Sequence, residues 1–279
     1  MSKDMNTNSN TYTVIYTTII VTLVAAILAF VSQGLKAKQE ANEKADTISQ
    51  MLTAAQFATK AELQKMGNTA VLAKYAEEIE NAFTVNKDGK KVADLELDQV
   101  FSPKELKKQN YKIKDGSEAE LPVFIFKNGI TVVPVYGAGL WGPVWGYIAF
   151  EPNSNAIKGA YFDHESETAG LGAKIKDDPE FQAEFNGEKA DFSNANVFDI
   201  VKGGAPKNAD GTSVIDNKID AITGATMTSN GLDAAIDTWL GAYAAYFKVT
   251  AATDEECCCE GDSCEEDMSC CEDKKTEEE

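Results

Sequence analysis

The sequence predicts an α+β domain carried on a single N-terminal transmembrane helix. One long segment near the N-terminus, residues 5–35, contains no Asp, Glu, Lys or Arg. The middle of the chain reads mainly as strands joined in hairpins, with helices before and after them, and this order favours α+β over a doubly wound parallel sheet. The apolar content of 43% and the aromatic content of 9% are those of a chain that builds a core.

The transmembrane anchor is expected at residues 12–34, after an N-terminal segment at 1–11. Residues 14–31 are mostly Ile, Val, Leu, Ala and Phe, and a helix of about 20 apolar residues crosses the hydrocarbon layer. Tyr12 and Tyr16 are expected near one membrane interface.

A cleaved signal peptide is the alternative interpretation of this segment. Lys3 is balanced by Asp4, and no clear cleavage site of small residues follows the apolar run. An uncleaved anchor is therefore preferred. Lys36 and Lys38 follow it, but this bias is too small to set the orientation by the positive-inside rule.

The charge of the chain is concentrated in its last 29 residues. From Ala251 onward there are 13 acidic residues and 2 lysines, a net charge of −11, which leaves −8 of the total of −19 for the rest. Such an acidic chain gives no electrostatic support for binding nucleic acid. All six cysteines lie in the same segment: Cys257, Cys258, Cys259, Cys264, Cys270 and Cys271. We expect residues 251–279 to be a disordered tail, with metal binding by its thiolates as the alternative and no metal site elsewhere.

The segment between the anchor and the strands reads as helical. Residues 35–58 are rich in Ala, Lys, Gln and Glu and are expected to form a helical stalk, and residues 59–250 to form the α+β domain. Thr59 and Glu62 are spaced as a capping box for a new helix. The apolar positions expected on one face of that helix are Val71, Leu72, Tyr75, Ile79 and Phe83.

Strands are expected next, in a series of hairpins. Residues 121–127 and 130–135 flank Asn128-Gly129, a strong hairpin signal, and Pro134 suggests that the second strand ends there or lies at an edge. Residues 144–150 and 156–162 read as two more strands, and 196–201 as a short one. A helix is expected to start at Asp177 or Asp178, with Phe181 and Phe185 packed inward.

The last expected helix covers residues 230–247, with Thr228 or Ser229 as its cap. Its apolar stripe consists of Leu232, Ala235, Ile236, Trp239, Leu240, Tyr243 and Phe247. Immediately before it, residues 220–229 read Asp-Ala-Ile-Thr-Gly-Ala-Thr-Met-Thr-Ser. The free N–H groups of a helix start favour an anion such as a phosphate. From physics alone, however, hydroxyl residues at this position are more often caps than phosphate ligands.

The segment Asp220-x-x-Thr223-Gly224-Ala225-Thr226 resembles the flavinylation sequence of FMN-binding respiratory subunits. In that family a flavin transferase moves FMN from FAD onto the threonine hydroxyl as a phosphoester. The resemblance places covalent FMN on Thr226 and implies that Asp220 serves recognition by the transferase.

Two further segments strengthen the resemblance and narrow it to one of these respiratory subunits. Residues 137–146, with Gly139-Leu140-Trp141, and residues 164–172, with Glu167-Thr168-Ala-Gly170-Leu171-Gly172, are similar to segments of the C subunit of the Na⁺-translocating NADH:quinone oxidoreductase, Nqr. The second has one additional residue between His164 and Glu167. The resemblance covers about residues 12–248.

The resemblance implies which residues surround the flavin. Expected cofactor-binding residues are Thr226, Thr223, Gly224, Ala225, Thr228, Trp141, Leu140, Gly139, Glu167, Thr168, Gly170, Leu171 and Gly172. Trp141 is expected near the isoalloxazine ring, and Glu167 and Thr168 as polar contacts to the ring or the ribityl chain. We expect no catalytic role for His164 or for any other residue of this chain.

By resemblance, the chain relays electrons from NADH towards quinone in a sodium pump, together with the other membrane subunits of Nqr. The flavin domain is then on the periplasmic side of the bacterial inner membrane. The equivalent flavoprotein of the Rnf ferredoxin:NAD⁺ complex and a membrane-tethered binding protein without flavin are the alternatives. The chain lacks a Gly-x-Gly-x-x-Gly fingerprint, so we do not expect it to oxidise NADH alone.

Overall fold

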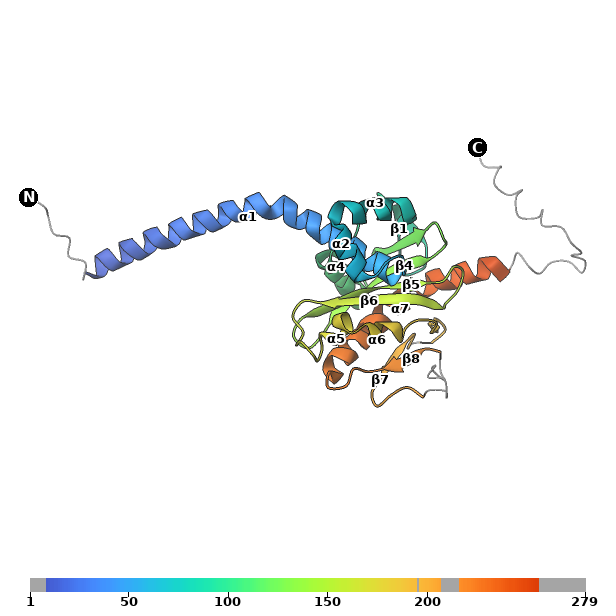
Figure 1. The fold of residues 1–279 in the computed structure, drawn as a ribbon. Coiled ribbons are helices and arrows are strands. Elements are labelled where there is room, and N and C mark those ends of the chain that lie inside the picture. Colours follow the sequence, from blue (N-terminus) through green and yellow to red (C-terminus); the bar gives the residue numbers. More distant parts are fainter. Residues whose placement is uncertain (1–8, 195, 207–215, 256–279) are drawn as a thin grey trace, which may run out of the picture.

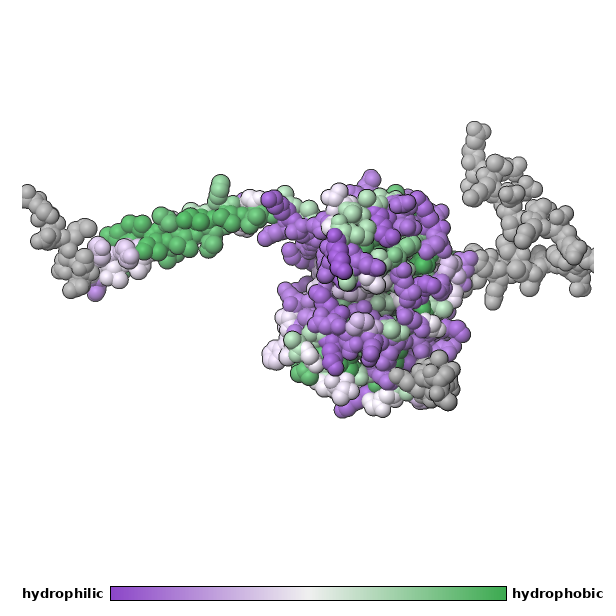
Figure 2. Space-filling view, viewed as in Figure 1, coloured by the Kyte–Doolittle hydropathy of each residue, from purple (hydrophilic) through white to green (hydrophobic). Residues whose placement is uncertain are grey.

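The protein is a long N-terminal helix that enters an α+β domain (Figure 1). The computed structural model describes residues 9–194, 196–206 and 216–255; the cysteine-rich segment lies outside them. The first helix, α1 (Asn10–Ala54), runs without interruption through the expected anchor and most of the expected stalk. It is the one helix among the described residues that is long and apolar enough to cross a membrane. Figure 2 shows its N-terminal half as an exposed apolar rod.

The C-terminal turns of α1 belong to the domain core. Ile48, Met51 and Leu52 are fully buried, because their spacing places them on one face of the helix. They pack with α2 (Lys60–Met66) and α3 (Asn68–Glu78). The Thr59–Glu62 capping box at the start of α2 is confirmed.

The prediction of a single helix that starts after Thr59 and continues through Phe83 is wrong. Gly67 has a φ of 78° and separates α2 from α3, and Ile79 starts β1 (Ile79–Val85). The helix α4 (Pro103–Asp115), which was not predicted, carries its own capping box formed by Ser102 and Glu105.

The sheet has six antiparallel strands in the order β2-β1-β3-β4-β5-β6. Its other strands are β2 (Lys91–Asp94), β3 (Leu121–Phe126), β4 (Thr131–Ala138), β5 (Pro143–Phe150) and β6 (Ile157–His164). The predicted hairpin at Asn128-Gly129 joins β3 to β4. The prediction that the second strand ends at Pro134 or lies at an edge is wrong, because β4 continues to Ala138 inside the sheet. β3 pairs with β4 only at Thr131 and Val132. Proline has no N–H, and at Pro134 no hydrogen bond to β3 is lost by its absence.

The antiparallel pairing of the sheet confirms the α+β class, and helices cover both of its faces. The end of α1, with α2 and α3, covers one face, and α5 (Lys174–Asp177), α6 (Pro179–Ala183) and α7 (Thr226–Glu255) cover the other (Figure 1). Asp178 caps α6 as predicted, with Phe181 and Phe185 buried. A separate parallel pair, β7 (Asp199–Val201) and β8 (Lys218–Asp220), leads into α7.

The last helix begins four residues earlier than predicted. Its first residue is Thr226, so Thr228 and Ser229 lie in its first turn and do not cap it. The Ser229 hydroxyl instead accepts a hydrogen bond from the N–H of Ile222 at 3.1 Å. The predicted apolar stripe is confirmed, with Leu232, Trp239 and Tyr243 fully buried against the sheet.

Candidate functional site

Three segments distant in sequence meet at one end of the domain. They are the β4–β5 connection (139–142), the segment after β6 (165–172) and the start of α7 (223–228). Glu167 joins them. Its Oε1 accepts a hydrogen bond from the backbone N–H of Trp141 at 2.9 Å, and its Oε2 accepts one from the Thr228 hydroxyl at 2.7 Å. The fold therefore brings the three predicted flavin-binding segments together.

Thr226 occupies the first position of α7 and is half-buried. The turn before it depends on Gly224, whose φ of 83° is in the left-handed region that glycine adopts without strain. The N–H of Ala225 closes this turn on the carbonyl of Ile222. The first N–H groups of a helix have no partner within it, and with the helix dipole they favour an anion. Thr226 thus lies at a helix start that favours a bound anion such as a phosphate.

Large apolar side chains on the same segments are exposed. The exposed fractions are 51% for Leu140, 68% for Trp141, 44% for Leu171 and 61% for Met227. Leu171 also approaches the turn before Thr226, since its Cδ2 is 3.2 Å from where a Cβ on Gly224 would lie. Exposed apolar side chains on neighbouring segments indicate a binding surface.

The other residues predicted around the flavin, and Asp220 of the motif, differ in exposure and in the contacts that they make. Thr223 and Thr168 are exposed, and Ala225 is buried. The carbonyl of Thr168 accepts hydrogen bonds from the N–H groups of Leu171 and Ala173, so it forms the turn after β6. Gly170 has a φ of 75° in this turn with open space beside it. Asp220 receives a hydrogen bond from the N–H of Ala205, which gives it a structural role besides any role in recognition.

Two of the predicted glycines provide space for the Glu167 side chain. A Cβ on Gly139 would collide with Glu167 Oε1, and a Cβ on Gly172 with Glu167 Oε2 and the Thr228 hydroxyl. His164 is also part of this arrangement, because its Nδ1 accepts a hydrogen bond from the N–H of Glu167 at 3.1 Å.

Sequence reasoning missed Met227 and Ser166. Met227 is the apolar residue directly after Thr226, and it is exposed. A large apolar residue inside the polar segment before the last helix was the sequence signal that could have identified it. The Ser166 hydroxyl donates to the carbonyl of Trp141 at 2.9 Å. No sequence signal identifies that contact, because the two residues lie on different loops.

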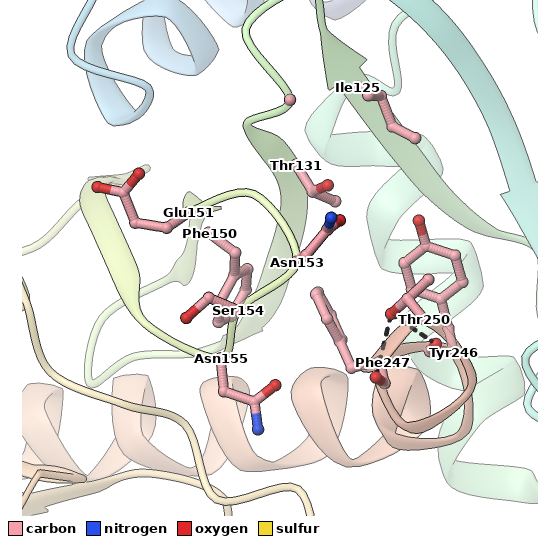
Figure 3. A pocket seen from close by; sticks show the side chains of 11 residues that line it. Ile125, Thr131, Phe150, Glu151, Asn153, Ser154, Asn155, Tyr246, Phe247 and Thr250 are labelled. Atoms are coloured by element: carbon pink, nitrogen blue, oxygen red, sulfur yellow. Dashed lines mark hydrogen bonds between the residues drawn. The ribbon is translucent and has the colours of Figure 1, made fainter. Parts of the chain in front are cut away.

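A cavity of about 190 Å³ lies far from this site, near the other end of α7 (Figure 3). Phe150, Tyr246, Phe247 and Thr250 are among its lining residues. Thr226 and Tyr246 are separated by 20 residues of helix, or about 30 Å. None of the predicted flavin-binding residues lines this cavity, so we do not assign it to the flavin.

Comparisons with known proteins cover the part of the chain that contains these segments. Residues 139–241, which contain the three segments, match the family model of the FMN-binding domain. The C subunit of the Na⁺-translocating NADH-quinone reductase from Vibrio campbellii is 35% identical over 124 residues, and the Pasteurella multocida protein of the same name is 36% identical over 124 residues. Each alignment covers 43% of this chain and 45% of the relative, so the match spans less than half the length of these relatives.

Solved structures extend the likeness over more of the chain. The crystal structure of the C subunit of the Na⁺-translocating NADH-quinone reductase from Parabacteroides distasonis is 30% identical, with a TM-score of 0.60, and the match covers 76% of this chain and 96% of that one. The Shewanella oneidensis NqrC structure is 26% identical, with a TM-score of 0.59, and the match covers 76% of this chain and 99% of that one. The chain therefore belongs to the NqrC family, the C subunits of the Na⁺-translocating NADH-quinone reductase.

Proposed function

We propose that Thr226 carries FMN through a phosphoester and that the chain is an electron-relay subunit of a Na⁺-translocating NADH:quinone oxidoreductase. The observation that carries this proposal is the position of Thr226. This half-buried residue lies at the N-terminus of α7, in the sequence that resembles the flavinylation motif, and exposed apolar side chains lie on the neighbouring segments.

The residues at the site fit FMN in three respects. Thr226 offers the hydroxyl for the ester, and the N–H groups of the first turn of α7 would hold the phosphate. Leu140, Trp141, Leu171 and Met227 would cover the ring, with Thr168 and Thr223 as exposed hydroxyls nearby. When bound, FMN supplies transfer of one or two electrons. The chain orients it and sets its surroundings.

The exposed apolar half of α1 supports a single-pass anchor in the bacterial inner membrane. α7 begins at the end of the domain from which α1 projects, and its last turns leave at the opposite end (Figure 1). The flavin is thereby presented on the side of the anchor, where the other subunits of the complex would contact it. We place this domain on the periplasmic side, by resemblance to the family. A reporter fused after Lys248 that is active only in the cytoplasm would contradict that placement.

A flavin transferase is the partner required for maturation. In-gel flavin fluorescence after denaturing electrophoresis tests the covalent bond, with the full chain co-expressed with the transferase. We expect a fluorescent band for the wild type and for Thr226→Ser, which keeps a hydroxyl, and a dark band for Thr226→Val. A dark wild-type band beside a labelled second substrate of the transferase would support a tethered binding protein without flavin.

The Rnf flavoprotein is the second candidate, because it shares the flavinylation sequence. The relatives and structures reported above carry the name of the Na⁺-translocating NADH-quinone reductase, and this favours Nqr. The donor of the purified complex separates the two: Nqr predicts reduction by NADH, and Rnf predicts reduction by reduced ferredoxin.

A further inference from the structure

We propose that Glu167 is a positioning residue that holds the Trp141 loop against the first turn of α7, and so sets the orientation of the flavin. We define the Glu167 clamp as the Glu167 carboxylate with its two donors, the Trp141 N–H and the Thr228 hydroxyl. The part of this proposal that concerns the flavin rests on the proposed function; the clamp itself does not.

The geometry assigns each oxygen of Glu167 to a different segment. The residue is 7% exposed, and its carboxylate oxygens accept from Trp141 N and Thr228 Oγ1 at 2.9 and 2.7 Å. The Glu167 N–H is itself fixed by His164 Nδ1. Both oxygens thus have a protein donor. A role in aligning two segments accounts for this better than the direct contact with the flavin expected from the sequence.

The surroundings of Glu167 are shaped for its carboxylate. Gly139 lies against one oxygen and Gly172 against the other, and a Cβ at either position would collide with it. Ser166 donates to the carbonyl of Trp141, so the backbone of Trp141 is held at both its N–H and its carbonyl. These two bonds fix the point on the backbone from which the exposed Trp141 side chain extends.

The charge of Glu167 is stabilised without a lysine. Among the described residues no ion pair includes Glu167, and burying an unpaired carboxylate is costly. The two donors reduce that cost, and Thr228 lies in the first turn of α7, where the helix dipole favours a negative charge. The carboxylate binds this turn on its buried side, since Thr228 is 1% exposed, whereas Thr226 is half-buried.

The flavin arm of the test uses the full chain in detergent, co-expressed with a flavin transferase. The variants are Glu167→Ala, Glu167→Gln and, as a control, Glu165→Gln at an exposed neighbouring carboxylate. Gln can accept from Trp141 N–H and donate to the Thr228 hydroxyl, so we expect it to retain the visible circular dichroism of the flavin. Glu167→Ala should reduce that signal severalfold while intact mass still shows FMN on the chain. A wild-type signal in Glu167→Ala would overturn the orienting role.

The second arm needs no flavin. In the Thr226→Val background, Glu167→Ala should raise hydrogen exchange at the Trp141 amide by about tenfold or more, because a charge-assisted bond is lost. Unchanged exchange there would overturn the clamp. If the wild type carries no FMN, the proposed function fails, and this exchange comparison still decides the clamp.

Thr228 variants test the clamp if Glu167→Ala does not fold. Thr228→Val removes the donor to Oε2 and should raise the exchange of the Trp141 amide and weaken the flavin dichroism. Thr228→Ser keeps the hydroxyl and should restore both signals. Equal behaviour of the two variants would overturn the proposal.

Discussion

Gly172 is buried between the Glu167 carboxylate and the Thr228 hydroxyl, where a Cβ has no space. Gly172→Ala should therefore destabilise the chain by about 1–3 kcal/mol through overpacking. Gly241→Ala is the matched control, because a Cβ added to Gly241 of α7 would meet no atom within 4 Å. It should stabilise by about 0.5–1 kcal/mol through helix propensity. Chemical denaturation of the full chain in detergent measures both, and a Gly172→Ala chain as stable as the wild type would refute the close packing.

Asp237, on α7, accepts hydrogen bonds from the backbone N–H groups of Val197 and Phe198 at 2.9 and 3.2 Å. Burial raises the pKa of this carboxyl above its ordinary value, and the charge of Asp233 adds to the effect. A raised folded-state pKa means that the folded chain binds the proton more tightly than the unfolded chain. The contribution of Asp237 to stability therefore rises as the pH falls through that pKa.

Asp237→Asn keeps an acceptor oxygen and removes the charge. We expect the variant to be at least as stable as the wild type at neutral pH, and its advantage to shrink as the pH is lowered through the carboxyl range. Denaturation of both chains at a series of pH values gives this difference directly. An advantage of the variant that grows on acidification would contradict the direction of the pKa shift.

The contacts of Glu167 could not be predicted from its type or its neighbours in sequence. Its two donors are 26 and 61 residues away along the chain. The motif indicated that this residue matters near the flavin, but only the assembled fold shows which atoms it binds.

At the scale of elements, α1 is fastened to the strands that carry two of the site loops. Gln50 is 2% exposed. Its Nε2 donates to Asp163 Oδ2 of β6 at 3.1 Å, and its Oε1 accepts from Trp145 Nε1 of β5 at 3.2 Å. Lys176 of α5 pairs with the other oxygen of Asp163 at 2.8 Å. This connection fixes the C-terminal part of α1 relative to the end of the domain where the three site segments meet.

Gln50→Leu conserves bulk and removes these hydrogen bonds, which leaves a buried carboxylate with fewer donors. We expect a loss of about 1–3 kcal/mol in the free energy of unfolding. Gln39→Leu, at an exposed position of the same helix, should have little effect. Denaturation followed by tryptophan fluorescence compares them, and an equal effect of the two substitutions would show that α1 is held by its apolar face alone.

The elements that the sequence predicted well have strong local signals. The Asn128-Gly129 turn and the apolar stripe of the last helix are examples, and both are confirmed. The start of β1 was missed because Ile79 and Phe83 continue the helical spacing of Val71 and Tyr75. Pairing with β2 and with β3, the latter more than 35 residues away in the chain, makes that segment a strand.

At the scale of the molecule, one helix joins the exposed apolar segment at the N-terminus to the core of the domain. α1 has 45 residues, a length of roughly 68 Å at 1.5 Å per residue, and its last turns form part of the core. The end of α1 packs on the sheet, and the sheet packs on α7. This arrangement suits a protein that presents a bound flavin to membrane partners in a fixed orientation.

The central claim is that Thr226 carries FMN. We would test it first by peptide mapping of the full chain co-expressed with a flavin transferase. Cleavage after Lys218 and Lys248 releases residues 219–248, which contain the motif, and fragmentation distinguishes Thr226 from Thr223 and Thr228. The account predicts the mass of an FMN phosphoester on Thr226 that is absent in Thr226→Val. An unmodified peptide, obtained while the transferase labels another substrate, or FMN on a different hydroxyl would contradict it.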